Sequence, residues 1–359
     1  MNIIYIRRNE IPSSQPVKRF LKVLKNYFYC YDQDGFFEDS LQAIEATKHA
    51  VSFKYLRNRV VPLDKDTEAV IVNLKCCNFN DAQEQKQFFR DFLRGKDHIV
   101  KCLFINAAQV SYMFDDEILD NFDVIFKREP YKNKDLYAIS AKNKAKIKST
   151  MIHCPFVYAP RTNFFAQLYK NFVPKTNPCR PRGEKYDVGF SGVDASTHTI
   201  RRDAWQAVVD AGFKTVGGLQ PNPHNSEVLP IKLQGPRQKG RSYRAALCNA
   251  KINLALNGIG EYTFRHQELL YLGKFILSSP AIQALELPIP LEEGKHYVAY
   301  TDVDDMIEKI YYYISHDEER QRIAKAGHDL FMEHYNPVRH GAYISNAILE
   351  ARKTKESLM

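Results

Sequence analysis

The sequence has no long hydrophobic run. No stretch of its 359 residues reaches the roughly 18 consecutive apolar residues that a transmembrane helix requires. The N-terminal segment MNIIYI is too short for a secretion signal or a membrane span. We therefore expect a cytoplasmic protein, and any membrane contact would be peripheral, at the inner face of the membrane.

Paired cysteine motifs and zinc motifs are also absent. The seven cysteines are odd in number, lack Cys-x-x-Cys spacing and include the adjacent Cys76 and Cys77. This pattern predicts buried free thiols in a reducing compartment. The eleven histidines contain no His-Glu-x-x-His motif, so we predict no metal site and no cofactor. Two Asp-x-Asp pairs raise a metal-dependent alternative, although Asp302 with Asp304 is more typical of a helix cap; the other pair is Asp32 and Asp34.

Positively charged residues outnumber negatively charged ones. The net charge of +9 suits an anionic partner, such as a nucleotide, a phosphorylated glycan or an acidic membrane surface. The basic residues are scattered, and the run from Lys142 to Lys148 is interpreted as a solvated stretch. No helix-turn-helix, zinc-finger or ribonucleoprotein pattern accompanies them, so nucleic acid is an unlikely partner.

The chain is long enough for two domains, and 44% apolar with 26% charged residues is typical of globular proteins. In the first half, short apolar runs alternate with amphipathic segments, which predicts a parallel sheet covered on both faces. The expected strands are 2–6, 69–74, 100–105 and 123–126, and the expected helices are 17–27 and 82–93.

The same alternation restarts after a proline-rich stretch. The expected strands are 186–190, 214–217, 252–256, 275–277 and 297–300, and the expected helices are 199–211, 242–249, 264–272, 303–315 and 318–334. We predict an α/β protein with two Rossmann-like, doubly wound domains facing a cleft. The expected boundaries are an N-terminal domain over 1–150, a linker over 151–185, a second domain over 186–340 and a C-terminal helix or tail over 341–359 that could cross back.

The most informative stretch runs from Ser242 to Ser279. It predicts a helix, a buried strand, a glycine-containing loop, a second helix and a second strand. The loop, which includes Tyr262 and Thr263, leads to a helix N-terminus, where free backbone N–H groups and the helix dipole favour an anion. Arg265 could contact a diphosphate there, and Glu268, one turn later on the same face, could accept ribose hydroxyls. An ordinary intrahelical ion pair is the alternative interpretation.

This stretch resembles the donor-binding segment of GT-B glycosyltransferases, particularly the exostosin-like and CgeB-like groups. Their helix carries Arg-x-x-Glu, followed by a glycine and an apolar strand, and the matching positions are Arg265, Glu268 and Gly273. The spacing also resembles the second glutamate of the Glu-x7-Glu motif, which implies that Glu268 binds the ribose. The first glutamate would fall on Gly260, so the resemblance assigns neither a donor-sugar contact nor a retaining mechanism.

Two further features fit donor binding. Gly189, Ser191 and Gly192 are interpreted as a glycine-rich turn after the first strand of the second half, where backbone amides could approach phosphate. Arg201 and Arg202 open the next helix, and we assign Arg202 to the donor site. Arg241 lies in a basic loop and could neutralise the leaving diphosphate. A plain tight turn and an exposed loop are the alternatives.

The sequence does not identify the catalytic base. An inverting enzyme would need one to deprotonate the acceptor hydroxyl, and the candidates are Asp32, Asp34, Asp115, Asp116 and Glu129.

We therefore predict a metal-independent glycosyltransferase that moves a sugar from a nucleotide-sugar to a glycan, glycolipid or other hydroxyl acceptor, as in polysaccharide or lipopolysaccharide biosynthesis. The nucleotide-sugar is a substrate, and the acceptor is expected to be an anionic or lipid-linked glycan. A nucleotide-sugar epimerase of the same fold, a basic DNA-binding or DNA-modifying protein and an inactive relative stay open as alternatives.

Overall fold

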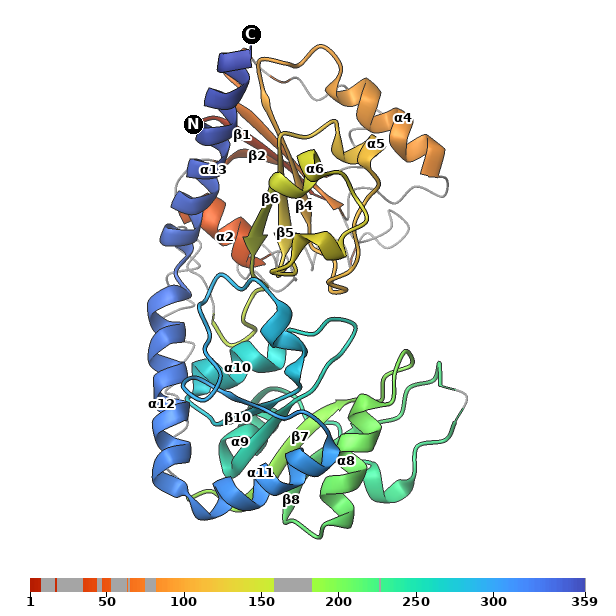
Figure 1. Cartoon of the computed structure of the whole chain (residues 1–359), viewed down its shortest axis with the longest axis vertical. Helices are drawn as coiled ribbons and strands as arrows, with labels where there is room; N and C mark the ends of the chain where they lie inside the picture. The colour runs from red at the N-terminus through yellow and green to blue at the C-terminus, as the bar shows by residue number, and fades with distance from the viewer. Residues whose placement is uncertain are drawn as a thin grey trace. The chain divides into compact units, whose positions relative to one another are not determined.

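The chain folds into two compact α/β units (Figure 1). The computed structural model describes residues 1–7, 17, 35–43, 47–52, 63, 65–74, 82–157, 183–225 and 227–358. The first unit comprises residues 1–173, 286–288 and 336–359, and the second comprises 174–285 and 289–335.

The first unit contains a parallel sheet with the strand order β2-β1-β3-β4-β5-β6. Its strands are short and rich in β-branched and aromatic residues, which favour extended backbone. Their bounds are β1 Ile3–Arg7, β2 Thr47–Ser52, β3 Ala69–Asn73, β4 Val100–Ile105, β5 Val124–Arg128 and β6 Ile147–Thr150. Every residue of β3 is buried, as expected for a strand covered on both faces.

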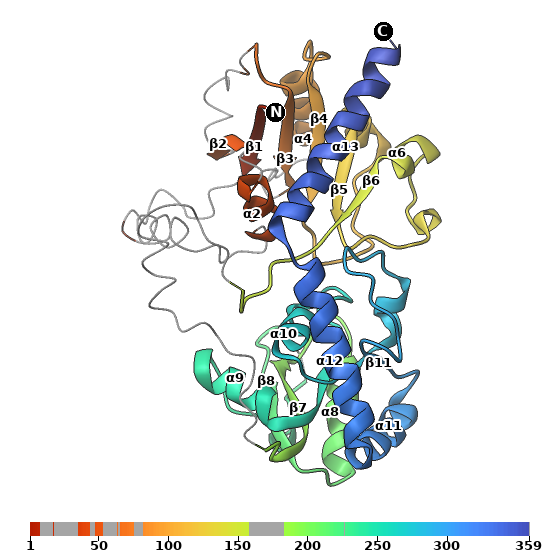
Figure 2. The ribbon, with the colours of Figure 1, turned by 90° about the vertical axis from the view of Figure 1, so that its left-hand side faces the viewer.

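Helices cover both faces of this sheet. Phe37 of α2 stacks on Phe104 of β4 with ring centroids 4.1 Å apart, and Ile344 of α13 joins the same core. On the other face, Phe89 of α4 packs edge-on against Phe122, 5.4 Å away. Figure 2 shows α13 running alongside α2. The helices are α2 Gly35–Ala43, α4 Ala82–Leu93, α5 Asp116–Leu119, α6 Ala141–Ala145 and α13 Pro337–Leu358, with a 3-10 turn η2 at Lys134–Leu136.

The second unit contains another parallel sheet, with the order β11-β10-β9-β7-β8. Its strands are β7 Tyr186–Val193, β8 Thr215–Gln220, β9 Ala250–Ala255, β10 Ile276–Ser278 and β11 Val298–Ala299. The helical segments are α8 Ile200–Asp210, η3 Ile231–Leu233, α9 Gly240–Asn249, α10 Phe264–Leu272, η4 Pro280–Ala284, α11 Val303–Ser315 and α12 Asp317–His334.

Two groups of helices sandwich this sheet. Trp205 of α8 and Met306 and Ile310 of α11 are buried in one core with the strand residues Val188 and Ile252. Helix α9 packs on β7 and β9, and α10 packs on β9, β10 and α12. The prediction of two Rossmann-like α/β units is confirmed.

The predicted elements recur closely, and the differences have physical causes. Helices 82–93, 264–272 and 303–315 and strand 100–105 have the predicted bounds. The predicted helix 17–27 lies outside the described residues except for Val17. Asp302 caps α11 as predicted, because its side chain accepts from the Asp305 amide at 2.9 Å.

Three sequence expectations were wrong. The lysine run is not one solvated stretch, because α6 and β6 lie within it and burial lowers the pKa of Lys146. The segment Gly189–Gly192 is not a turn, because β7 continues to Val193. Cys102 and Cys154 are buried and form no disulfide, as expected, whereas Cys248 is disulfide-bonded. Among the described helices, none is long and apolar enough to cross a membrane.

Strand β8 approaches its neighbours at a glycine pair. Gly217 has φ +99°, and a Cβ there would lie 1.9 Å from the Phe190 carbonyl oxygen of β7. Gly218 faces Gly235, whose amide donates to the Leu219 carbonyl at 3.1 Å. Glycine is therefore required for β8 to lie against the carboxyl half of β7.

Gly217→Ala should destabilise the second unit severely, by about 4 kcal/mol, because a backbone clash adds to an unfavourable φ. Gly212→Ala is the matched control. It also has positive φ, +76°, but no atom lies within 4 Å of its added Cβ, so about 1 kcal/mol is expected. Urea denaturation followed by circular dichroism measures both, and equal losses would contradict the close packing described above.

Candidate anion site at the carboxyl ends of β7 and β9

The second sheet changes winding direction at β7. Strand β8 lies on one side of β7, and β9 lies on the other. The connections that follow β7 and β9 therefore diverge, and open α/β sheets bind ligands at the carboxyl ends of the strands at such a point. The end of β7 and the loop 256–263 after β9 come together there.

Arg265, in the first turn of α10, is the main cation at this point. Its Nη2 donates to the Ser191 carbonyl at 2.5 Å, and its guanidinium carbon lies 5.1 Å from the Tyr243 ring centroid and 5.9 Å from that of Phe190. The side chain is 11% exposed. Its Nη1 is buried without a hydrogen-bond partner. A buried guanidinium with an unused donor is suited to an anionic ligand.

Arg201 of α8 is the second cation; the sequence named it with Arg202 at the start of this helix but assigned Arg202 to the donor site. Its Nε donates to the Asn257 carbonyl at 2.7 Å, and its Nη1 donates to the Val193 carbonyl at 2.8 Å. Burial lowers the pKa of Arg201, and the positive charge of Arg265 lowers it further. Two like charges thus influence each other at one sheet edge, and an anion between them would relieve the repulsion.

The loop after β9 leaves room for these cations. A Cβ on Gly258 would lie 2.7 Å from Arg201 Nη2, so a larger residue would displace the guanidinium. Gly258 is therefore needed because the Arg201 guanidinium packs against it, and not because the backbone there is strained.

His266 fixes the N-terminus of α10. The Thr263 amide donates to its Nδ1 at 3.1 Å, so Nε2 carries the proton and donates to Ser278 Oγ at 3.0 Å. The ring stacks on Tyr262, with centroids 4.9 Å apart. Burial lowers the pKa of His266 to about 3, so the ring stays neutral and holds the helix end in place.

Glu268 lies beside Arg265, as the spacing predicted. Its Oε2 is 3.5 Å from Arg265 Nε and accepts a short hydrogen bond from the Tyr243 hydroxyl. The side chain is 7% exposed, so this is not a solvated surface pair. Burial raises the pKa of the Glu268 carboxyl above its ordinary value, although Arg265 and Tyr243 oppose the rise.

The remaining residues predicted for the donor site pack within β7, cap or pack at the start of α10, or lie exposed on α9. Gly189 lies inside β7, where an added Cβ would be 2.7 Å from Ala250 Cβ, and Gly192 faces the Phe190 ring. Ser191 Oγ donates to Gln238 at 3.0 Å, and its carbonyl holds Arg265. Thr263 caps α10, and Tyr262 is buried against His266. Arg241 is exposed in the first turn of α9.

Among the described residues, Arg202 pairs with two carboxylates and not with the residues around Arg265. Its Nη2 lies 2.6 Å from Asp194, and its Nη1 lies 2.5 Å from Glu227. Two carboxylates therefore neutralise the arginine that the sequence favoured, whereas Arg201 reaches the edge occupied by Arg265. Successive helical residues point about 100° apart, and the sequence does not reveal which of the two has acidic partners.

The acidic candidates of the first unit are engaged in structural contacts. Asp115 caps α5, and Asp116 accepts from Ser140 and from Asn143 at 2.7 Å, which lowers its pKa. Glu129 bonds the Ile152 amide at 3.2 Å and Arg128 Nε at 3.1 Å, and burial raises its pKa. Asp32 and Asp34 lie outside the described residues.

No group of three or more His, Cys, Asp or Glu side chains in the described part of the chain is arranged to hold a metal ion.

Comparisons with known proteins agree with the two-unit α/β fold. Residues 201–345 match a family model described as "Glycosyl transferase-like". The whole fold is similar to Anabaena Alr3699/HepE in complex with UDP, with 9% identity and a TM-score of 0.54 over 98% of this chain and 100% of that one. It is also similar to an alpha-glucosyltransferase in complex with UDP and a 13-mer DNA, with 10% identity and a TM-score of 0.53 over 97% and 99%.

A third similar structure is TarM, with 12% identity and a TM-score of 0.50. The match covers 82% of this chain but only 57% of TarM. No curated protein sequence matches the chain. These likenesses establish the fold, which is that of the GT-B glycosyltransferases.

The buried carboxyl of Glu268 predicts a pH effect on stability. Because its folded-state pKa is raised, its contribution to stability is largest below its ordinary value of 4.5 and declines as the pH rises through the folded-state pKa. The free energy of unfolding of the wild type, relative to Glu268→Gln, should therefore fall as the pH rises from 4.5 through the folded-state pKa.

Glu292→Gln is a control of opposite sign. Lys295 holds the pKa of the exposed Glu292 below its ordinary value of 4.5, so the wild type should gain relative to this variant as the pH rises toward 4.5 and the difference should be constant above it. Chemical denaturation at several pH values measures both differences. A flat difference for Glu268→Gln would contradict the burial of an ionisable carboxyl.

Proposed function

We propose that the protein is a glycosyltransferase that transfers a sugar from a nucleotide-sugar to a hydroxyl acceptor. The observation that carries this proposal is the pair of partly buried guanidinium groups, Arg201 and Arg265, at the point where the second sheet changes winding direction. The match of residues 201–345 to a glycosyl transferase-like model and the similar fold of UDP-bound proteins support it.

In this proposal, the donor diphosphate occupies the space beside Arg265 and Arg201. Arg265 Nη1 would donate to a phosphate oxygen, because it lacks another partner among the described residues. Glu268, on the next turn, would accept ribose hydroxyls, exchanging its bond from Tyr243 for bonds from the nucleoside.

During transfer, the bond between the sugar's anomeric carbon and the diphosphate oxygen breaks. A new bond forms to the acceptor oxygen, whose proton passes to a base that we do not assign. Negative charge builds up on the departing diphosphate, and the two guanidinium groups would stabilise it electrostatically. Fixed positive charge at this position supports a reaction that does not require a metal ion.

The acceptor in this proposal is an anionic or lipid-linked glycan, used at the cytoplasmic side with peripheral membrane contact. The net charge of +9 and the exposed basic residues of the loop before α9 support an anionic partner. These residues are Arg237 and Lys239, and the exposed Arg241 follows in the first turn of α9.

Nucleotide binding should depend on Arg265. The melting temperature should rise with at least one of UDP, GDP, CMP and dTDP, because a ligand that binds only the native state stabilises it. Arg265→Ala should weaken that nucleotide by about 10- to 100-fold, as expected for losing a charge-assisted hydrogen bond. Isothermal titration calorimetry measures the dissociation constants.

Arg322→Ala is the matched control, because Arg322 is 61% exposed and pairs only with Glu319, 3.9 Å away, among the described residues. Its nucleotide affinity should equal that of the wild type. The assignment fails if the wild type and Arg265→Ala bind every nucleotide and nucleotide-sugar equally poorly. In turnover assays, loss of activity with EDTA would contradict metal independence, and conversion of the donor without an acceptor would indicate an epimerase.

A further inference from the structure

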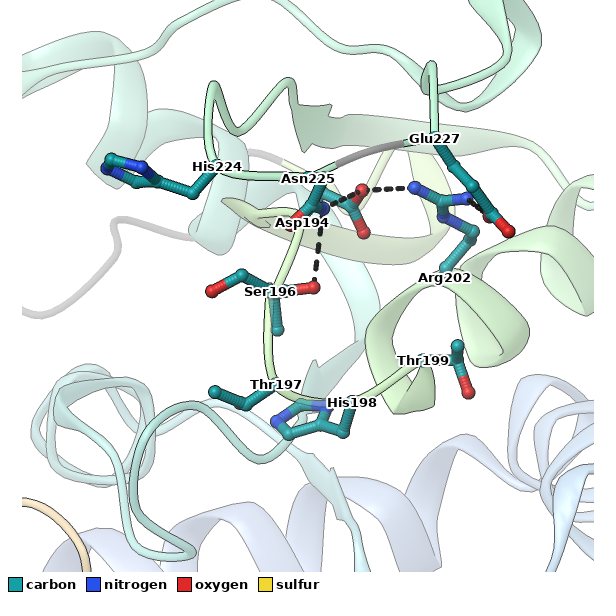
Figure 3. Close-up of a pocket in the computed structure, with 10 residues that line it drawn as sticks. Asp194, Ser196, Thr197, His198, Thr199, Arg202, His224, Asn225 and Glu227 are labelled. Atoms are coloured by element: carbon teal, nitrogen blue, oxygen red, sulfur yellow. Dashed lines mark hydrogen bonds and ion pairs between the residues drawn. The ribbon is translucent and has the colours of Figure 1, made fainter.

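A separate cavity is lined by the loop that follows β7, and its lining includes neither Arg201 nor Arg265. It has a volume of about 340 Å³ and is lined by the loop 194–199, by Arg202 and by His224, Asn225 and Glu227. Figure 3 shows Arg202 held between Asp194 and Glu227, with His198 near the end of the loop. This volume is at the lower end of the range for small-molecule sites, so it suits one ring rather than an extended ligand.

The charge of this cavity differs from that of the anion site. Its only guanidinium, Arg202, is bonded to both lining carboxylates, Asp194 and Glu227. Two carboxylates against one arginine leave the lining without excess positive charge. This cavity therefore offers no excess positive charge to a phosphate group, whereas Arg201 and Arg265 do.

Two buried acceptor atoms in the lining lack a donor. Asn225 uses its Nδ2 to donate to Asp194 at 2.7 Å, which leaves its Oδ1 without a partner. His198 Nε2 lies 2.8 Å from the Gly258 carbonyl, so Nε2 carries the proton and Nδ1 of the neutral ring is an acceptor. That Nδ1 is also buried without a partner. Satisfying such atoms requires hydrogen-bond donors.

The exposed hydroxyl side chains of Ser196, Thr197 and Thr199 complete the lining. Hydroxyls both donate and accept, as do the hydroxyls of a carbohydrate, whereas phosphate oxygens only accept. Through His198, the cavity adjoins Gly258, the residue packed against Arg201 in the anion site.

We propose that this cavity binds one uncharged pyranose ring of a carbohydrate substrate, next to the diphosphate site. The inference rests on the proposed function and adds to it a hydroxyl-binding subsite. The ring belongs either to the nucleotide-sugar donor or to the glycan acceptor, and both present the same hydroxyl groups.

Thr197→Trp tests the proposal by filling the cavity from an exposed position. UDP affinity should stay within about twofold of the wild type, because the anion site is untouched, and this also reports correct folding. Binding of the sugar-bearing ligand should weaken at least about tenfold, as expected for the loss of one or more hydrogen bonds. Ser196→Tyr is a second filling variant, and Glu318→Trp, at an exposed position of α12 outside the lining, is the control.

Two titrations distinguish the sources of the ring. Weakened UDP-glucose with unchanged UDP indicates the donor sugar. If the affinity for UDP-glucose is unchanged, methyl glycosides of glucose, galactose, mannose or N-acetylglucosamine are titrated into the UDP-loaded protein. Loss of their binding in Thr197→Trp indicates the acceptor. If Thr197→Trp binds all these ligands as the wild type does, the proposal is overturned. It is also overturned if the wild type binds no glycoside and Thr197→Trp weakens UDP and UDP-glucose equally.

Failure of the proposed function is recognised separately. If the wild type binds no nucleotide, the donor assignment fails, whereas methyl glycosides titrated by NMR against the nucleotide-free wild type and Thr197→Trp still test the cavity. Equal line broadening in both proteins would then overturn the sugar subsite.

Discussion

The structure of the second unit depends on burying a positive charge that its own residues only partly compensate. Arg265 is 11% exposed, its carboxylate neighbour Glu268 is 3.5 Å away and shared with Tyr243, and Nη1 has no hydrogen-bond partner. Removing a charge from water costs several kcal/mol unless it is paired. Arg201 makes the cost larger by placing a second cation close by. In our proposal, an anionic ligand neutralises the two guanidinium groups and offsets this cost.

The parallel sheet is what brings these groups together. Strands β7 and β9 are neighbours with parallel direction, so their carboxyl ends meet at one edge. Ser191 and Val193 supply carbonyls from β7, and Asn257 supplies one from the loop after β9. The glycines act through packing: Gly217 and Gly189 allow close strand approach, and Gly258 leaves space for Arg201. The loop after β7 also lines a separate cavity, whose lining includes Arg202 but neither Arg201 nor Arg265.

The sequence predicted whatever depends on local periodicity. Continuous apolar strands and amphipathic helices gave the two α/β units, and the spacing of Arg265 and Glu268 placed both on one face of α10. The selection of Arg202 over Arg201 shows the limit, because it depends on Asp194 and Glu227, which the fold brings to Arg202. The extension of β7 through a glycine-rich segment depends on pairing with β8. The packing of α13 on α2 likewise joins distant segments, and it leaves no periodic signal.

The coupling between Arg201 and Arg265 tests the central claim most directly. A double-mutant cycle with Arg201→Gln, Arg265→Gln and the double variant, measured as free energies of unfolding, isolates their interaction. The coupling should be unfavourable, in the range of about 0.5–3 kcal/mol, in the free protein, and it should become favourable with saturating UDP or whichever nucleotide binds, because both cations then contact one diphosphate. A coupling that is zero, or that the nucleotide leaves unchanged, would contradict an anion site built from these two residues.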